Sequence, residues 1–405
     1  MTDYPINRRQ FLQSTTTLGL GLGLAGASFA KSSANTDRQL VVIILRGGMD
    51  GLSAVFPFQD KQLKKLREPL LVPENEILKI DQHFAMHPAF KNCYQFYLNN
   101  ELSICHAVAT PYRQRSHFDG QNILEIGLTR ADDRASGWLN RAVAINQQYN
   151  AIAIGQAVPP ILRGDADISS WTPSQVDGPS DDTLDRLLTL YNHDAFLSPR
   201  LQQALQAQDL VGDAINESSM TGRQRRSRNN LQNLIAPSVE FLSAENGPNI
   251  AVLQSDGWDT HANQGNAQGQ LARKFTALDT SIQSLRQGLA ERWQTTIVLV
   301  VTEFGRTVSV NGTRGTDHGT AGVALIAGGA LSHSLKQTKR SGGLLTEWPG
   351  LAPQQLYENR DLFPQTDMRA VFKSVLHHHL GYAQRQLDQQ IFPGSENIPY
   401  FSTLA

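Results

Sequence analysis

The clearest pattern in the chain is a set of short runs that are apolar at most positions instead of alternating between apolar and polar. Such runs predict strands that are buried on both faces, as in a parallel sheet. Thr296–Val301 (TIVLVV) is an unbroken example made of aliphatic and β-branched residues. We expect strands of this kind at residues 40–45, 102–109, 249–253, 296–301 and 323–327.

Segments with apolar residues at helical spacing separate these runs. Pro88 and Ser116 favour the start of a helix, and each stands at the beginning of one segment. The expected helices are residues 87–99, 117–125, 271–292 and 367–380. Strands that alternate with helices indicate a mostly parallel sheet with helical crossovers, so we predict an α/β fold.

The middle of the chain departs from this alternation. Residues 156–180 are rich in Pro, Gly, Ser and Asp, and residues 181–210 have a helical pattern. We therefore predict one α/β domain over residues 40–405 that carries a largely helical insertion at about 156–245. The sequence contains no internal repeat.

The first 30 residues have the features of an export signal. Arg8 and Arg9 precede a glycine-rich apolar segment at 18–27, and small residues follow up to Ala30. This order is typical of a secretory leader, and the arginine pair favours the twin-arginine translocase as its partner. The apolar segment is too short for a membrane span. We predict a signal peptide at 1–30, a polar linker at 31–39 and a periplasmic or secreted protein; an ordinary amphipathic first helix is the alternative.

The net charge and the cysteine content limit the kinds of partner and of covalent cross-link that we expect. The net charge of the 405 residues is -1, so electrostatics favours neither nucleic acid nor an anionic membrane surface as a partner. The hydrophobic fraction of 40% is enough for a core at this length. Cys93 and Cys105 allow at most one disulfide, and two buried free thiols are the favoured interpretation.

Acidic residues follow three of the predicted strands. Asp50 comes after the first strand, Asp256 and Asp259 after the strand at 249–253, and Glu303 directly after the strand at 296–301. In open α/β sheets, ligands bind just beyond the carboxyl ends of the strands. We therefore expect a polar, metal-binding site at this edge, with Asp50 suited to a hard cation. A turn aspartate is the plain alternative for Asp50.

Two histidines strengthen the metal hypothesis. Asp259 and His261 lie close together on one loop, as in a chelating segment for a divalent metal. Asp317 and His318 lie in a glycine-rich loop, where Asp317 can orient the His318 ring and His318 can bind metal or act as acid or base. The alternative for the first loop is that its aspartates only bind backbone N–H groups.

Ser116 and Arg306 are candidates for catalysis. Ser116 stands at an expected helix N-terminus, where backbone N–H groups and the helix dipole favour anions, so it is a possible nucleophile or a plain N-cap. His117 and Asp119 lie close enough to join the site, or they belong to the helix surface. Arg306 can bind an oxyanion through two hydrogen bonds, or it can pair with Glu303.

Several motifs together resemble a known family. The leader and the stretches LRGGMDG, RSHFDGQNILE, DGWDTH, TEFGRT and GTDHGTAG resemble the domain-of-unknown-function 1501 proteins, which are exported bacterial proteins of the alkaline phosphatase–sulfatase superfamily. The resemblance covers essentially the whole mature chain. It implies a three-layer α/β/α sandwich with a mostly parallel central sheet, and a site that usually holds two metal ions.

The resemblance also implies roles for individual residues. Asp50 would match the metal-binding aspartate after the first strand, Ser116 the nucleophile at a helix start, and His318 a late loop histidine. Asp259 and His261 would represent an Asp-x-x-x-His segment, at a shorter spacing.

One superfamily motif is altered. A strand that ends in Asp-His would match Glu303-Phe304, and Phe304 cannot ligate a metal. The departures leave the metal open among Zn, Mg, Mn and Ca, as one ion, two ions or an empty site.

The sequence thus predicts an exported, metal-dependent hydrolase that acts on a small phosphate or sulfate ester. The expected metal ligands are Asp50, Asp259, His261, Glu303, Asp317 and His318, and the expected catalytic residues are Ser116, Arg306 and His318. The rival hypothesis is a non-catalytic periplasmic binding or assembly protein, which the loss of a ligand at Phe304 favours. A serine esterase ranks last because the chain lacks a G-x-S-x-G motif.

Overall fold

The structure is a computed structural model of the 405-residue chain. It describes residues 37–130, 136–173, 181–191, 231–331 and 347–404, together with the short stretches 194, 197–198, 201 and 344–345. The predicted signal peptide at 1–30 and most of the linker lie outside the described residues.

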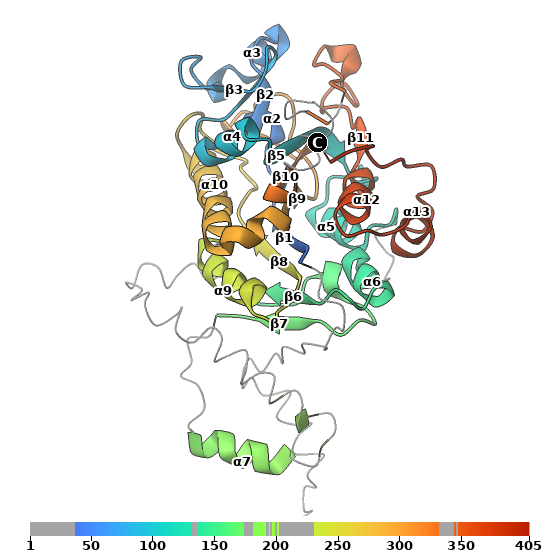
Figure 1. The fold of residues 1–405 in the computed structure, drawn as a ribbon. Helices are drawn as coiled ribbons and strands as arrows, with labels where there is room; N and C mark the ends of the chain where they lie inside the picture. Colours follow the sequence, from blue (N-terminus) through green and yellow to red (C-terminus); the bar gives the residue numbers. More distant parts are fainter. Residues whose placement is uncertain are drawn as a thin grey trace, which may run out of the picture.

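A central sheet organises the molecule, with strand order β11-β5-β10-β9-β1-β8-β6-β7 (Figure 1). The neighbours β9, β1, β8, β6 and β7 pair in parallel, as do β5 and β11. The strand bounds are β1 Gln39–Leu45, β5 Leu102–Ala109, β6 Ala151–Ile154, β7 Ser169–Trp171, β8 Ile250–Ser255, β9 Thr296–Thr302, β10 Gly322–Ala327 and β11 Thr366–Asp367.

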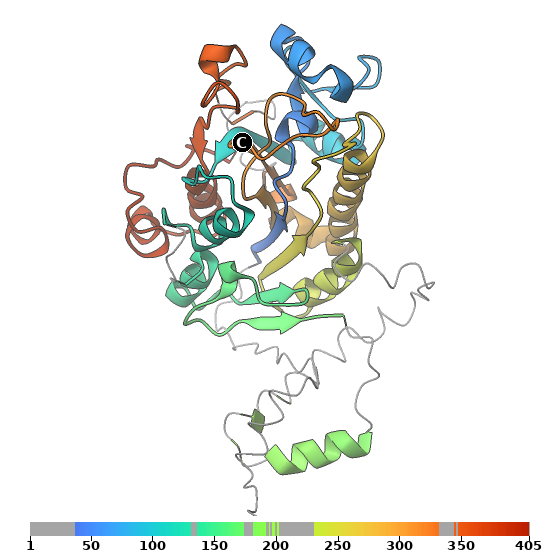
Figure 2. The same cartoon turned by 180° about the vertical axis from the view of Figure 1, so that it is seen from behind.

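Alternate side chains of β1 enter two separate cores, which makes three layers. Val41 and Ile43 join the core under the helices α4 (Lys91–Leu98), α9 (Leu231–Ser243) and α10 (Gln270–Leu289). Leu40 and Val42 join the core under α5 (His117–Ile126), α6 (Trp138–Ile145) and α12 (Met368–His378). Figures 1 and 2 show these two groups of helices on opposite faces of the sheet. The prediction of an α/β sandwich with a mostly parallel sheet is confirmed.

Strand β10 runs opposite to its neighbours, because it pairs antiparallel with both β9 and β5. An antiparallel return needs no crossover helix. Residues 303–321, which join β9 to β10, therefore stay at the edge where β9 ends. The glycine-rich segment with Asp317 and His318 is thus held beside Glu303 instead of crossing the sheet.

A small second sheet extends from the carboxyl end of β1. After the short helix α2 (Gly51–Ala54), β2 (Val55–Pro57) and β3 (Leu78–Lys79) both pair with β4 (Phe84–Met86). Helix α3 (Lys61–Arg67) lies between β2 and β3 in the sequence. Asp60 caps α3, since its carboxylate accepts from the N–H of Gln62. This segment, from α2 to β4, places Arg67 at the edge where β1 ends.

Most expected elements agree with the structure to within one or two residues at each end. The helix expected at 87–99 is an exception, because α4 begins at Lys91. Residues 84–86 belong to β4, and the N–H of His87 donates to the carbonyl of Ala54 at 2.9 Å. The backbone before Lys91 is therefore held by the small sheet and is not free to start the helix.

The region expected as a helical insertion at about 156–245 contributes to the main body at both ends. Strand β7 is the outer strand of the central sheet, and α9 packs against α10. Helix α7 (Asp181–Tyr191) is described, but residues 174–180 and 202–230 are not. The bounds of an insertion stay a prediction.

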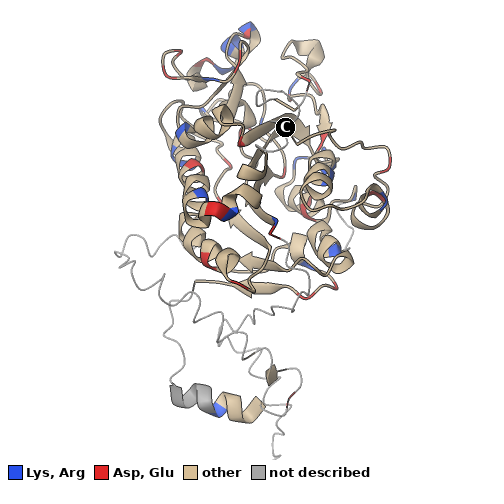
Figure 3. Ribbon diagram, viewed as in Figure 1, with Lys and Arg blue, Asp and Glu red and all other residues tan. Residues whose placement is uncertain are grey.

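Charged residues are interspersed over the outer helices such as α10, while the strands are nearly free of them (Figure 3). Cys93 and Cys105 are both buried thiols that form no disulfide, as the sequence favoured. In the described part of the chain, every helix is too short or too polar to span a lipid bilayer.

Candidate metal centre

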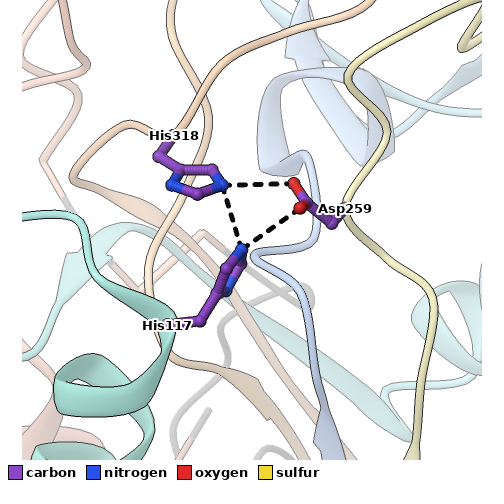
Figure 4. A group of neighbouring side chains, drawn as sticks. All are labelled: His117, Asp259 and His318. Carbon is purple, nitrogen blue, oxygen red and sulfur yellow. Dashed lines mark hydrogen bonds and ion pairs between the residues drawn. The ribbon is translucent and has the colours of Figure 1, made fainter.

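Three chain segments meet beyond the carboxyl ends of the strands. The loop after β8 carries Asp259 and His261, the first turn of α5 carries His117, and the loop before β10 carries His318. Figure 4 shows His117, Asp259 and His318 pointing toward one another from these three segments. One ligand atom from each of the three lies within 4.8 Å of the others.

The contacts of this group use the same nitrogen of each imidazole. The Nε2 atom of His318 lies 2.9 Å from Nε2 of His117 and 3.0 Å from Nε2 of His261. The Asp259 carboxylate faces all three rings, at 3.3 Å from His117, 3.0 Å from His261 and 3.3 Å from His318. These four potential ligands form one cluster, in which His117, Asp259 and His318 have ligand atoms within 4.8 Å of one another and His261 borders His318 and Asp259. We refer to them below as the four-ligand group.

The other nitrogen of each ring has an acceptor. Nδ1 of His117 lies 2.7 Å from the Glu303 carboxylate, Nδ1 of His261 lies 3.1 Å from the Asp317 carboxylate, and Nδ1 of His318 lies 2.9 Å from the carbonyl of Arg115. A carbonyl or an ionised carboxylate only accepts, so each Nδ1 must carry its proton. Each neutral ring then turns an unprotonated Nε2 toward the centre.

The pKa directions of the two carboxyl acceptors agree with this assignment. Burial would raise the pKa of Glu303, but hydrogen bonds from His117, Gln121 and the backbone outweigh it and lower that pKa. The Asn311 hydrogen bond, with a further contribution from His261, lowers the pKa of Asp317. Both carboxylates are thus ionised acceptors at neutral pH.

Two further pKa shifts concern the ligands themselves. Burial lowers the pKa of His318, which favours its neutral ring. Burial would raise the pKa of Asp259, but the hydrogen bond and charge of Arg306 lower it. The hydrogen bond to Glu303, more than the opposing effect of burial, raises the pKa of His117.

The residues present fit a divalent cation. Where neither nitrogen carries a proton, two Nε2 atoms at 2.9–3.0 Å repel unless a cation separates them. Zn–N bonds of about 2.0–2.1 Å place two nitrogens of a tetrahedral site about 3.3–3.4 Å apart. The Nε2 atom of His318 and each of its neighbours, His117 and His261, therefore need to separate by only a few tenths of an ångström to suit such an ion.

Glu303, which we expected to be a ligand, lies behind His117. It is fully buried, and the carboxylate also accepts from the backbone N–H of Gly47 at 2.9 Å and from Gln121 Nε2 at 3.1 Å. Thr302 donates to its second oxygen at 3.0 Å. The contacts of Glu303 therefore orient His117 instead of pointing to the centre. Asp317 stands in the same relation to His261.

Asp50, the other expected ligand, lies in a different network. Its two oxygens accept from Arg67 Nη1 at 2.9 and 2.7 Å, and one of them also accepts from Ser53 and Gln264 at 2.7 Å each. Asp50 is fully buried, and no hydrogen bond joins it to the four-ligand group within the described ranges. The structure thus separates Asp50 from Asp259, His261 and His318.

Arg306, the expected oxyanion clamp, is also buried, with a side-chain exposure of 0%. Its guanidinium donates to Asp259, to the hydroxyl and carbonyl of Thr316, and weakly to the carbonyl of Gly47. These acceptors occupy all three of its nitrogens. Arg306 therefore holds Asp259 in place, and its buried guanidinium is directed to protein acceptors instead of to a bound substrate.

Ser116 is the N-cap residue of α5, and its side chain makes no capping hydrogen bond. Its backbone N–H lies 3.3 Å from the Tyr112 hydroxyl. Within the described residues, the Ser116 hydroxyl makes no hydrogen bond to the four-ligand group. Ser116 is thus next in sequence to the potential ligand His117, and its hydroxyl does not cap the helix.

The sequence left His117 open between a residue of the site and a residue of the helix surface. Its side chain faces the sheet edge, and its ring packs on Phe304 with 4.8 Å between centroids. Phe304, the position where the superfamily pattern has a ligand, also packs against His318 at 5.2 Å. The sequence held a signal for His117: a histidine directly after a helix cap is a candidate ligand where the expected pattern has Phe304 at a ligand position.

Comparisons with known proteins agree with the family resemblance. The model of the family described as "Protein of unknown function (DUF1501)" matches residues 106–391, which include His117, Asp259, His261 and His318. No curated protein sequence matches the chain.

Several solved structures are similar to the chain at low identity. The C-terminal periplasmic domain of EcEptC from Escherichia coli is 10% identical, with a TM-score of 0.41 and coverage of 91% of this chain and 90% of that one. Alkaline phosphatase from the Antarctic bacterium TAB5 is 14% identical, with a TM-score of 0.33 over 76% of this chain and 99% of that one.

A third similar structure is an inactive variant of murine ectonucleotide pyrophosphatase/phosphodiesterase 5 in complex with AMP. It is 10% identical, with a TM-score of 0.33, and the match covers 66% of this chain and 57% of that protein. At these scores, none of the three adds to the fold and the site already described.

Proposed function

Because the chain belongs to the DUF1501 family, whose description names no activity, we propose a function from the site itself: a metal-dependent hydrolase of small phosphate or sulfate esters. One observation carries the proposal. Three imidazole Nε2 atoms and one carboxylate form a cluster, while each imidazole is oriented by an acceptor on its far side. This arrangement is typical of protein metal sites and is costly without a cation.

The ligand types narrow the choice of metal. The four-ligand group offers three nitrogens and one carboxylate, and zinc takes this set readily. Manganese is the second choice among the metals expected from the sequence. Magnesium and calcium prefer oxygen ligands and are disfavoured here. We therefore propose one zinc ion, held by His117, Asp259, His261 and His318.

The residues of the chain then have separate roles in the reaction. A divalent ion supplies a Lewis acid that stabilises negative charge on the ester group. Ser116 attacks the phosphorus or sulfur, the alcohol leaves, and water then cleaves the serine ester to release phosphate or sulfate and restore the hydroxyl. Glu303 and Asp317 hold His117 and His261 in their orientations, and Arg306 holds Asp259.

Two observations support Ser116 as the nucleophile. It is the residue directly before His117, so a group bound at the metal lies within reach of the start of α5. Its side chain is also not used to cap that helix. Backbone N–H groups of the first turn of α5 favour an anionic ester at this place.

A second function has one observation in its favour. All three guanidinium nitrogens of Arg306 bind protein acceptors. An Arg306 that is buried and bound to protein acceptors does not clamp an anionic ester, which fits a metal-binding protein that does not hydrolyse one. The non-catalytic binding or assembly protein therefore stays as the alternative.

Metal titration of the purified chain tests the proposed centre. The metal-free protein is titrated with Zn²⁺, Mn²⁺, Mg²⁺ and Ca²⁺, and we expect one Zn²⁺ per chain with the tightest affinity. His117→Ala should weaken zinc binding by about 100-fold, since it removes one of four ligands. The matched control is His83→Ala, whose histidine is exposed in the bend before β4. A wild-type chain that binds none of the ions, or a His117→Ala variant that binds zinc as tightly, contradicts the proposal.

Turnover separates the hydrolase from the binding protein. The zinc-loaded chain is assayed on aryl phosphates, aryl phosphodiesters and aryl sulfates. We expect activity on one class and a fall of about 10³-fold or more in Ser116→Ala. Tight zinc binding without turnover on any substrate favours the binding protein. Full turnover in Ser116→Ala refutes the role of the serine.

A further inference from the structure

Gln264 is a fully buried side chain in the loop after β8, between His261 and α10. An amide can donate two hydrogen bonds from its nitrogen and accept two at its oxygen. Gln264 uses all four: the oxygen accepts from Thr260 and Thr316, and the nitrogen donates to Asp50 and Ser53. A buried polar side chain that makes all of its possible hydrogen bonds is held in one position and orientation.

The oxygen of Gln264 joins the two loops that carry ligands. The Thr260 hydroxyl donates to it at 2.7 Å, and Thr260 stands between the ligands Asp259 and His261. The Thr316 hydroxyl donates to the same oxygen at 2.9 Å, and Thr316 stands two residues before His318.

The backbones of these loops are paired as well. The N–H of Thr316 donates to the carbonyl of Thr260 at 3.2 Å, and the N–H of Gln264 donates to the carbonyl of Arg314 at 2.9 Å. The amide of Gln264 therefore bridges the two loops next to the ligand residues. The position of one loop relative to the other sets the distances between these ligands.

The nitrogen of Gln264 is anchored to the buried ion pair. It donates to Asp50 at 2.7 Å and to Ser53 at 3.1 Å. Arg67 keeps Asp50 ionised, so the carboxylate only accepts and the amide must present its NH₂ to it. This dependence fixes which end of the amide faces Thr260 and Thr316, a choice that otherwise follows only from the hydrogen-bond network.

The network continues to a ligand. The Thr316 hydroxyl accepts from Arg306 Nε at 3.2 Å, and Arg306 in turn donates to Asp259. One path of hydrogen bonds therefore runs from Arg67 and Asp50 through Gln264, Thr316 and Arg306 to the Asp259 carboxylate. Asp50 belongs to the site by this path and not as a ligand.

We propose that Gln264 is a positioning residue, which holds the two ligand-bearing loops in register and anchors them to the Asp50–Arg67 pair. The inference rests on the proposed metal centre. It states that the Gln264 amide sets the affinity of the four-ligand group for its ion, in addition to stabilising the fold. Its substitution should therefore change metal binding even in a chain that folds normally.

The first test is Gln264→Met, which keeps most of the side-chain volume and removes every hydrogen bond of the amide. We expect the zinc affinity of the full chain to fall by about 10- to 100-fold, as for other residues that orient ligands. Circular dichroism and the unfolding midpoint of the metal-free protein report on folding. Gln270→Met is the control, because Gln270 begins α10 directly after this loop and its side chain donates to a backbone carbonyl at the surface.

The second test does not require Gln264→Met to fold. Thr316→Val keeps the shape of threonine but loses the hydroxyl, whereas Thr316→Ser keeps the hydroxyl and loses a methyl group. If hydrogen bonding to Gln264 sets the metal affinity, Thr316→Val weakens zinc binding and Thr316→Ser preserves it. Equal losses in both variants point to packing alone and overturn the proposal.

The outcomes distinguish this inference from the proposed function. A wild-type chain that binds no metal overturns both. A wild-type chain that binds zinc, with Gln264→Met binding it equally well, overturns the role of Gln264 and leaves the metal centre standing. Weaker zinc binding in Gln264→Met and Thr316→Val, with Gln270→Met unchanged, supports the role.

Discussion

At the residue scale, Asp50 and Arg67 form an ion pair whose side chains are 1% and 2% exposed. Burial by itself would raise the pKa of Asp50. The charge of Arg67 and hydrogen bonds from Arg67, Ser53 and Gln264 outweigh that effect and lower it. Arg67 also donates to the carbonyls of Thr307 and Val308, so the pair ties the end of β1 to the loop after β9. Removing one partner leaves the other charge buried and unpaired.

This pair predicts a pH-dependent stability. Asp50→Asn should lower the free energy of unfolding of the metal-free chain by about 3–5 kcal/mol at neutral pH, because Arg67 loses its counter-charge. A lowered folded-state pKa contributes stability that is present above the unfolded value, about 3.9, and is lost as the pH falls through the folded value. The difference between wild type and variant should therefore shrink below about pH 4.

Denaturant unfolding at a series of pH values measures this difference. The control is Asp165→Asn, since Asp165 is exposed. A destabilisation by Asp50→Asn that stays constant down to acid pH would mean that the carboxylate charge is not what holds Arg67.

At the scale of elements, the site is made by loops that approach one another very closely. Gly47, after β1, has a φ of +121°, and a Cβ added there would lie 2.6 Å from the backbone nitrogen of Asp259. Its N–H donates to Glu303, and its carbonyl accepts from Arg306. The ends of β1, β8 and β9 are thus packed backbone to backbone, so only glycine fits at this position.

Gly47→Ala should therefore weaken zinc binding. The methyl group pushes the Asp259 loop away from the end of β1, and the backbone strain costs about 1–3 kcal/mol of stability. Gly312→Ala is the control, because a Cβ at Gly312 meets no atom within 4 Å. Zinc titration and thermal unfolding of both variants measure the two effects. Unchanged zinc affinity in Gly47→Ala would show that the loops can separate without disturbing the ligands.

The elements around the site differ in how well the sequence predicts them. Strands β1, β5, β8, β9 and β10 follow from apolar runs, since a strand covered on both faces has no polar side to interrupt it. The segment that contains α3 and the small sheet has no comparable apolar pattern in its sequence. Its elements have two to seven residues, which are too short to establish a period. Arg67, on which Asp50 depends, was therefore not predicted.

At the scale of the whole molecule, the sandwich brings distant segments to one edge. His117 and His318 are separated by 201 positions, yet their Nε2 atoms lie 2.9 Å apart. The antiparallel course of β10 makes this possible, because it returns the loop after β9 to the edge where α5 begins. A metal bound between these segments would also link α5, the loop after β8 and the loop before β10.

Export is the remaining proposal at this scale, and residues 1–30 carry it. Replacement of both Arg8 and Arg9 by lysine should keep the chain in the cytoplasm, because the translocase recognises the arginine pair. Fractionation of cells that express the full chain measures this, and a host without the translocase serves as the reference. Unchanged export in the variant, or in that host, would contradict the twin-arginine route.

The sequence by itself determined the sandwich and the edge at which polar residues gather, because apolar runs and the residues that follow them are local features. It could not determine which of the gathered side chains are ligands. That depends on which side-chain lone pairs accept hydrogen bonds from other segments. Arg67 donates to both oxygens of Asp50, and His117 binds Glu303 through Nδ1 and directs its own Nε2 to the centre. Only tertiary structure makes these pairings, since the partners in each lie 17 and 186 positions apart.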